Sequence, residues 1–205
     1  GGDKVMTLNG NQYELKDIQV KSSDKVKVKL VYDCGNIEYV TLDDASCSTV
    51  ESTNEGLTFQ KDGYYDFYFK SDKTIYVGAN ESNPANAEKY YLMGVDGDWD
   101  KAEESNQLTQ NPNNADELVL LGQKISQSDS KADAIKIVKK SICAVDEYYA
   151  EVKPSSTVIY TGGGTGVNPP NIVIEDGTYD FYFNKTSGKI YITGSIKNAR
   201  VVYLD

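Results

Sequence analysis

The sequence predicts an all-β protein of two tandem immunoglobulin-like β-sandwich modules. The stretch at 62–77, DGYYDFYFKSDKTIYV, returns at 176–192 as DGTYDFYFNKTSGKIYI, with one residue added in the turn. Turn residues recur at strand-length spacing, and apolar residues nowhere hold a helical period for three turns. A repeat of this length is typical of tandem domains and not of a solenoid.

Both repeated stretches have the alternation of a β-hairpin, with an apolar inner face and a tyrosine-bearing outer face. The inner positions are Tyr65, Phe67 and Phe69, then Tyr179, Phe181 and Phe183. The outer positions are Tyr64, Asp66, Tyr68 and Lys70, then Thr178, Asp180, Tyr182 and Asn184. We expect the outward Tyr68, Tyr76, Tyr182 and Tyr191 to form cross-strand pairs, with a binding strip as the alternative.

The repeat divides the chain into a first module at 1–80 and a second at 88–195, joined by a short polar linker. In the second module we expect strands at 89–95, 117–125 and 134–139 and around 148–152, a Gly/Pro loop at 161–170, and the closing hairpin. Residues 129–140 fit a helical turn as well as a strand.

The first module matches the second only from Leu8, which aligns with Leu108, so the opening strand and its tryptophan loop are missing. Residues 14–20 then correspond to 117 onward, and 27–31 to the strand at 134–138. The last residues, 199–205, resemble the opening strand of the second module. They either begin a third repeat or return to complete the first module, whose sheet edge would otherwise be exposed.

Composition excludes several classes of function. The net charge of −10 and the sequence pI near 4.6, with no run of Lys or Arg, argue against nucleic acid and anionic membranes as partners. No apolar stretch is long enough for membrane insertion. The chain has no histidine, and no segment ties two of its 31 acidic residues to a catalytic pair, so we expect no enzyme and no cofactor. A neutral or cationic ligand fits this composition.

The three cysteines allow at most one intramolecular disulfide. Cys34 and Cys47 lie in the same module, so a bridge would join these two. The interpretation that the sequence favours is that Cys34 and Cys143, each a few residues beyond a lysine-bearing strand, are small buried hydrophobic residues.

A polar loop at 95–108 holds the only tryptophan, Trp99, between acidic residues that include Asp98. A tryptophan face can stack on a sugar ring while neighbouring carboxylates bind its hydroxyl groups. The alternative is that Trp99 folds back to cover the end of the sandwich.

The same loop raises the possibility of calcium. Asp96, Asp98 and Asp100 have the spacing that opens a calcium loop, but Lys101 stands where the EF-hand has Gly and Gln107 where it has Glu. A solvated turn is the interpretation that the sequence favours.

The order YYLMGVDGDWDKAEESNQL, then AIKIV, then DEYY resembles the starch-binding domains of glucoamylases and amylases. The resemblance implies that Trp99 is the first stacking residue, that Lys136 donates hydrogen bonds to the sugar, and that Tyr148 or Tyr149 is the second aromatic platform. A tyrosine replaces the family's second tryptophan. The closing DGTYDFYF hairpin is also similar to glycan-binding modules on surface proteins of starch-degrading gut bacteria.

The first module has no equivalent of Trp99. It keeps Lys27 or Lys29 and an aromatic residue, Tyr39, with Tyr32 as another that could stack on a sugar. The resemblance implies non-catalytic binding of α-glucan or maltooligosaccharide by part of a larger extracellular or cell-surface protein with other domains. The alternative function is a structural spacer or adhesion module without a glycan site.

Overall fold

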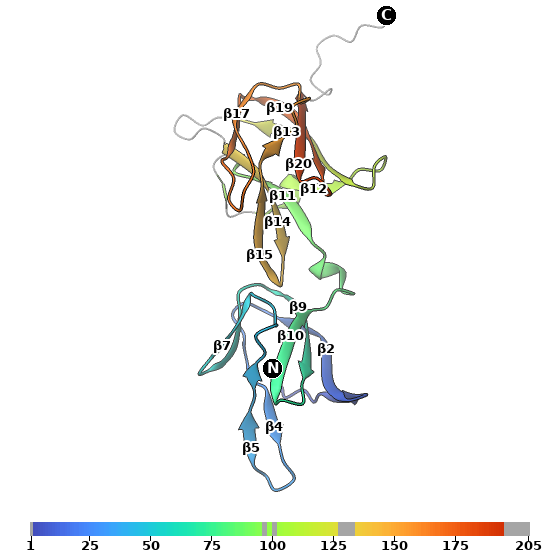
Figure 1. Ribbon diagram of the computed structural model, residues 1–205, viewed down its shortest axis with the longest axis vertical. Helices are drawn as coiled ribbons and strands as arrows, with labels where there is room; N and C mark the ends of the chain where they lie inside the picture. Colours follow the sequence, from blue (N-terminus) through green and yellow to red (C-terminus); the bar gives the residue numbers. More distant parts are fainter. Residues whose placement is uncertain (1, 96–97, 100–101, 127–133, 195–205) are drawn as a thin grey trace, which may run out of the picture. The chain divides into compact units, whose positions relative to one another are not determined.

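The computed structural model describes residues 2–95, 98–99, 102–126 and 134–194. Almost all regular structure in these residues is β-strand, which confirms the predicted all-β class (Figure 1). The chain divides into two compact units. Unit 1 comprises the chain up to Glu88 together with the turn Ser141–Val145, and unit 2 comprises the remainder. No helix among the described residues has the length and apolarity to cross a membrane.

Unit 1 is built from ten strands and one 3-10 turn. These are β1 (Thr7–Asn9), β2 (Gln12–Val20), β3 (Lys25–Val26), β4 (Lys29–Val31), β5 (Ile37–Tyr39), β6 (Thr41–Leu42), β7 (Val50–Thr53), β8 (Gly56–Phe59), β9 (Gly63–Phe69), β10 (Thr74–Ala79) and η1 (Pro84–Asn86). One sheet has the order β1-β2-β9-β10-β6, a second has β3-β8-β7, and β4 pairs with β5.

The described residues of unit 2 form a ten-stranded sheet in which nine strands follow one path, β16-β20-β19-β13-β12-β11-β14-β18-β17, and β15 pairs with β14 beside that path. They are β11 (Lys89–Met93), β12 (Gln107–Gln110), β13 (Glu117–Ile125), β14 (Ala134–Ser141), β15 (Ala144–Tyr149), β16 (Glu151–Val152), β17 (Tyr160–Gly162), β18 (Ile172–Ile174), β19 (Gly177–Asn184) and β20 (Lys189–Gly194), with the 3-10 turn η3 (Glu104–Asn106) before β12. The described part of 129–140 is therefore strand.

The two units share a strand order. β2-β9-β10-β6 in unit 1 matches β13-β19-β20-β16 in unit 2, and the last pair is parallel in both. Strand β3 pairs with β8 as β14 pairs with β18. The two hairpins predicted from the repeated stretches are β9–β10 and β19–β20.

Each unit has its own apolar core. In unit 2 the core includes Phe181 and Phe183 of β19 and Ile135 and Ile137 of β14. In unit 1 Tyr65 and Phe67 of β9 pack with β8 and β10. Alternation on these strands directs every second side chain inward, as the sequence pattern predicted.

The outer tyrosines form the predicted cross-strand pairs. Tyr68 is opposite Tyr76, with ring centroids 6.0 Å apart, and Tyr182 is opposite Tyr191 at 5.8 Å. On the same outer face, Asp66 and Asp180 are buried, with 9% and 7% exposure. The sequence pattern placed both residues on the outer face and did not predict their burial.

A β-bulge explains why these carboxylates are buried. Strand β2 shifts register between Leu15 and Ile18, and β13 between Leu120 and Gln123. The backbone N–H of Asp17, at the first bulge, donates to Asp66 Oδ1 at 2.9 Å, and that of Gly122 donates to Asp180 Oδ1 at 2.7 Å. A bulge leaves an N–H outside the ladder, and a carboxylate on the neighbouring strand supplies its acceptor.

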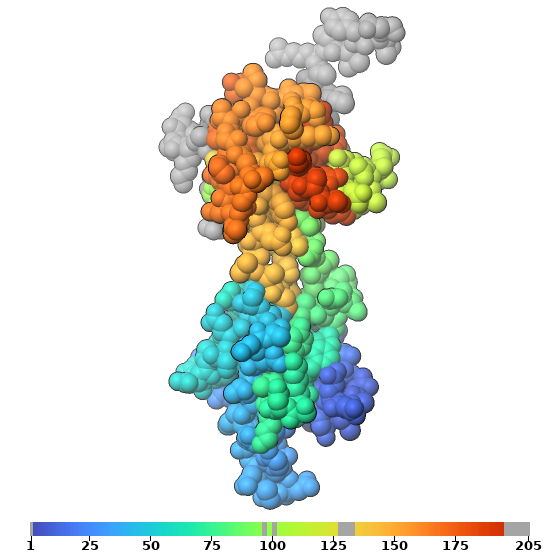
Figure 2. All heavy atoms as spheres, in the orientation of Figure 1, coloured from blue at the N-terminus to red at the C-terminus, as the bar shows by residue number. Residues whose placement is uncertain are grey.

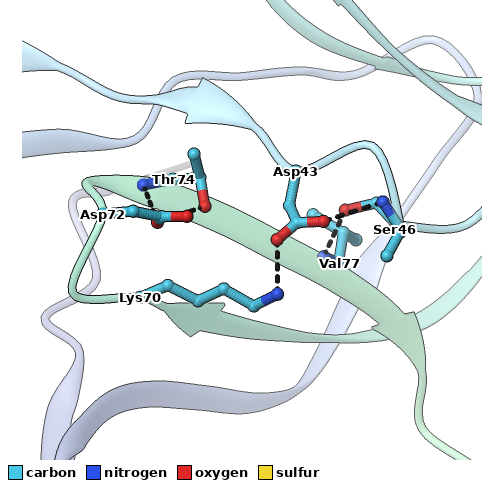
Figure 3. A network of polar contacts seen from close by, with 7 residues as sticks. Asp43, Ser46, Lys70, Asp72, Thr74 and Val77 are labelled. Carbon is cyan, nitrogen blue, oxygen red and sulfur yellow. Dashed lines mark hydrogen bonds and ion pairs between the residues drawn. The ribbon is translucent and has the colours of Figure 1, made fainter.

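The segment after β6 is fastened to β10 by polar contacts (Figure 3). Asp43 forms an ion pair with Lys70, and the N–H of Val77 donates to Ser46 Oγ at 3.0 Å. In unit 2 the N–H of Ile192 donates to Ser156 Oγ at 3.1 Å. In unit 1 this fastening leads directly to Cys47, whose own N–H donates to the carbonyl of Val77.

The disulfide joins Cys47 to Cys143, with the two Cα atoms 4.5 Å apart, and Cys34 is free and exposed. The expectation that Cys34 and Cys143 are small buried free cysteines was wrong, and so was the alternative of a Cys34–Cys47 bridge. Chain order placed Cys143 in the second module, whereas its turn belongs to unit 1. The segment 199–205, expected to complete the first module or begin a third, lies outside the described residues.

We predict that Asp180→Ala lowers the stability of unit 2 by about 1.5–3 kcal/mol, because the bulge N–H of Gly122 loses a charged acceptor. Urea unfolding followed by the fluorescence of Trp99 measures this loss. Asp180→Asn keeps an acceptor oxygen and should lose less. An Ala variant as stable as the intact chain would contradict the role of the carboxylate.

We predict that Cys143→Ser lowers the stability of unit 1 by about 2–4 kcal/mol, because the bridge closes a loop between cysteines 96 residues apart. Amide hydrogen exchange across β8, β9 and β10 reports on this unit. Cys34→Ser is the control and should leave exchange unchanged. Equal protection in both variants would show that the bridge does not stabilise unit 1.

Candidate functional site

Trp99 of unit 2 is seated on a glycine at the end of β11. Gly94 has a φ of 89°, and a Cβ there would lie 2.1 Å from the Ala134 carbonyl oxygen and 2.6 Å from Trp99 Cζ2. The N–H of Gly94 donates to the carbonyl of Asp98 at 2.8 Å, which closes the base of the loop. Only glycine allows this close approach. Trp99 remains 37% exposed.

Lys136 lies beneath two aromatic rings. It faces away from the core of unit 2, opposite Met93 of β11, because its neighbours Ile135 and Ile137 point inward. Its Nζ lies 5.8 Å from the ring centroid of Trp99 and 5.5 Å from that of Tyr148. The rings of Trp99 and Tyr148 therefore both lie close to one ammonium group.

Tyr148 of β15 forms the other side of the site. It packs against a small apolar cluster of Tyr91, Met93 and Val138, which lies on the opposite side of β11 and β14 from the main core. This cluster supports the ring of Tyr148 and leaves it half-buried. Trp99 thus packs on Gly94 and Tyr148 on the apolar cluster, and both rings remain partly accessible to solvent.

Lys136 is buried, and its ammonium group has one hydrogen-bond partner and two aromatic neighbours. The side chain is only 6% exposed, and this burial lowers the pKa of its ammonium group from the ordinary value of 10.5. Nζ donates a hydrogen bond to Asn168 Oδ1 at 2.6 Å. Desolvated cation–π contacts contribute roughly 1–2 kcal/mol each, so Lys136 holds both rings while its charge is compensated.

Asn168 was not predicted from the sequence. It lies in the Gly/Pro loop between β17 and β18, which has no periodicity to indicate which side chain faces the site. The only available signal was an amide side chain within an unusually long loop. Its side-chain oxygen accepts the hydrogen bond from Lys136, which adds an amide group to the site.

The other predicted residues lie elsewhere. Tyr149 follows Tyr148 on the opposite face of β15, where its ring contacts Phe183 at 4.9 Å and its hydroxyl donates to Glu147. Its pKa is raised to about 12, mainly by burial. Asp98 is half-buried at the base of the Trp99 loop. Of the two tyrosines, the structure brings Tyr148 to Trp99.

Unit 1 retains half of this arrangement. Residues 25–40 align without a gap with 134–149, a shift of two residues from the expected match of 27–31 with 134–138, which places Lys27 on Lys136 and Tyr39 on Tyr148. Lys27 Nζ lies 5.8 Å from the ring centroid of Tyr39, and the ring is 63% exposed. The tryptophan loop has no counterpart in unit 1. A cation–aromatic pair is therefore common to both units, whereas the two-ring site belongs to unit 2.

The remaining candidates offer less. A hollow of about 610 Å³ in unit 1 lies beside the Tyr68–Tyr76 pair, but Lys16 and Lys70 already lie over these two rings. Within the described residues no group of three Cys, Asp or Glu side chains could hold a metal ion. Two of the proposed calcium ligands, Asp96 and Asp100, lie outside the described residues.

We predict that the emission of Trp99 changes with pH below 10.5 as Lys136 loses its proton, and that Lys136→Met removes the transition. Because the folded chain releases this proton at lower pH than the unfolded chain, stability rises with pH between the lowered pKa and 10.5. A fluorescence titration measures the first effect, and urea unfolding at several pH values the second. Lys124→Met, at an exposed position, should behave as the intact chain; a transition that survives in Lys136→Met would contradict the assignment.

No family model matches the chain, and no curated protein is significantly similar to it.

Proposed function

We propose that unit 2 binds neutral α-glucan chains without catalysis, by stacking sugar rings on Trp99 and Tyr148. The observation that carries this proposal is the single ammonium group of Lys136, which lies within 6 Å of both ring centroids while Trp99 remains partly exposed. Aromatic faces bind the C–H surfaces of sugars, and adjacent polar groups bind their hydroxyl groups. Asn168 and Lys136 are the polar groups at this site.

The choice of α-glucan rests on the resemblance to starch-binding domains, in which residues at the positions of Trp99 and Lys136 contact the sugar. The net charge of −10 favours a neutral polymer over an anionic one. The exposed Lys27–Tyr39 pair of unit 1 offers a second, weaker contact with the same polymer. The binding protein works on the cell surface or outside the cell, where the Cys47–Cys143 disulfide persists.

A single site of this kind is weak. Burying about 100 Å² of apolar surface contributes roughly 2.5 kcal/mol, whereas a millimolar complex needs about 4 kcal/mol. Hydrogen bonds from Lys136 and Asn168 supply the difference. Weak sites become effective when several contact one polymer, which a repeated protein allows.

We predict that the chain is retarded in native gels containing amylopectin and that Trp99→Ala abolishes the retardation. Tyr148→Ala should weaken binding about tenfold, because one stacked ring contributes roughly 0.5–1.5 kcal/mol. Gels with pullulan, with xylan and without polysaccharide define the polymer. Calorimetric titration with a maltooligosaccharide measures the affinity directly.

Tyr13→Ala is the matched control, since Tyr13 is also exposed, at 46%, but lies on β2 of unit 1 and is none of the proposed stacking residues Trp99, Tyr148 and Tyr39. It should migrate as the intact chain in every gel. Equal mobility of all variants in all gels would refute glycan binding and favour the structural spacer. Retardation in xylan alone would support a glycan-binding site in this chain and refute α-glucan as its ligand.

A further inference from the structure

Strand β11 joins the two halves of the sheet of unit 2, and the described residues of unit 1 include no counterpart of it. β11 pairs with β12 on one side and with β14 on the other. In unit 1, β1 corresponds to β12, and β3 together with β4 corresponds to β14. β1 and β3 each lie at the edge of a separate sheet, and β4 pairs only with β5. One missing strand therefore explains why unit 1 has separate sheets where unit 2 has one.

The strand pairings show which residue of β1 would contact the missing strand. β1 pairs with β2 as β12 pairs with β13, and in these registers Thr7 takes the place of Thr109. Met6 therefore corresponds to Leu108, whereas the alignment expected from the sequence matched Leu108 with Leu8. In unit 2 Leu108 lies directly opposite β11.

The strand on the other side is interrupted where β11 would pair with it. In unit 2 the middle of β14, at Lys136 and Ile137, pairs with β11. The corresponding residues of unit 1, Lys27 and Val28, lie between β3 and β4 and belong to no strand. Hairpin β4–β5, which continues this stretch, projects from the rest of unit 1 (Figure 2). We call β1 and residues 27–31 the open edges, because such edges can accept an extended segment.

Apolar side chains at the open edges are less buried than their counterparts in unit 2. Leu108 and Ile137 are 3% and 0% exposed, whereas Met6 and Val28 are only half-buried. All four side chains belong to the apolar core of their own unit. A strand between the open edges would therefore remove apolar surface of unit 1 from water.

Unit 2 shows how a strand in this place completes the core. Leu92 of β11 is 0% exposed within that core, and the ring of Tyr90 lies 5.3 Å from that of Phe183. Phe69 of unit 1 takes the position of Phe183 in the repeat and is only half-buried. An occupant of the open edges must therefore have apolar side chains at the positions of Tyr90 and Leu92.

The chain contains a second segment with the sequence of β11. Residues 198–204, NARVVYL, match 86–92, NAEKYYL, at four of seven positions without a gap. The match places Leu204 at the position of Leu92 and Val202 at the other core-facing position. Both requirements of the open edges are met by this segment.

We propose that residues 198–205 of one copy of the chain add as a strand between the open edges of unit 1 of a second copy. Chain order supports a second copy as the acceptor. The segment 86–92 follows β10 and enters the next unit, and 198–205 follow β20 in the same way. Unit 1 of another copy then takes the part of the next unit. A head-to-tail contact of this kind produces open chains of molecules, and it does not depend on glycan binding.

Sedimentation of the full chain over a range of concentrations tests the proposal. All samples carry Cys34→Ser, so that disulfide dimers do not contribute. The average mass should rise with concentration above the 22.6 kDa of one chain. Leu204→Asp should weaken this association at least about tenfold, because a leucine that becomes buried is replaced by a charge. Val201→Asp is the matched control, since its counterpart Lys89 is exposed, and it should associate like the parent chain.

Amide hydrogen exchange shows where the segment binds. In the associated chain, residues 6–8 and 27–31 should exchange more slowly than in Leu204→Asp, while β19 of unit 2 exchanges equally in both. A chain that stays monomeric at every concentration would overturn the proposal, and slower exchange at 27–31 in that monomer would assign the strand to the same copy. Association that Leu204→Asp retains, or that leaves the open edges unprotected, would also overturn it.

Discussion

A buried carboxylate on an interior strand of each main sheet is the constraint on which the rest of the fold depends. Asp66 and Asp180 each satisfy the N–H that a bulge leaves unpaired in the neighbouring strand. The bulge changes the register of that strand partway along, so both ends can keep apolar side chains toward the core. Without an acceptor, a buried N–H would oppose this geometry.

The site of unit 2 forms because strand β14 contributes side chains to both faces of the sheet. Strand β14 gives Ile135 and Ile137 to the core and Lys136 to the opposite face, where a second apolar cluster supports Tyr148. Gly94 then allows Trp99 to close over the lysine. A buried cation is stable here because two ring faces and the Asn168 amide compensate its charge.

The sequence was sufficient to predict those features that depend on a local pattern of residues. Alternation of aromatic residues predicted the hairpins β9–β10 and β19–β20. The family resemblance singled out Trp99, Lys136 and either Tyr148 or Tyr149, and the structure brings Tyr148 to the other two. Asn168 could not be found because a loop has no period. The partner of Cys47 could not be found either, since a turn between two strands of unit 2 belongs to unit 1. The burial of Asp66 and Asp180 was not predicted, because a bulge leaves little trace in a pattern of alternating polarity.

Unit 1 is made of two separate chain segments, and this determines when it can complete its folding during synthesis. Its core includes Ile142 and Cys143, which the ribosome delivers more than fifty residues after the end of its continuous segment at Glu88. By then β11, β12 and β13 of unit 2 have already been synthesised. Unit 1 therefore completes its core only during the synthesis of unit 2, and a fragment cut at the linker lacks part of its own interior.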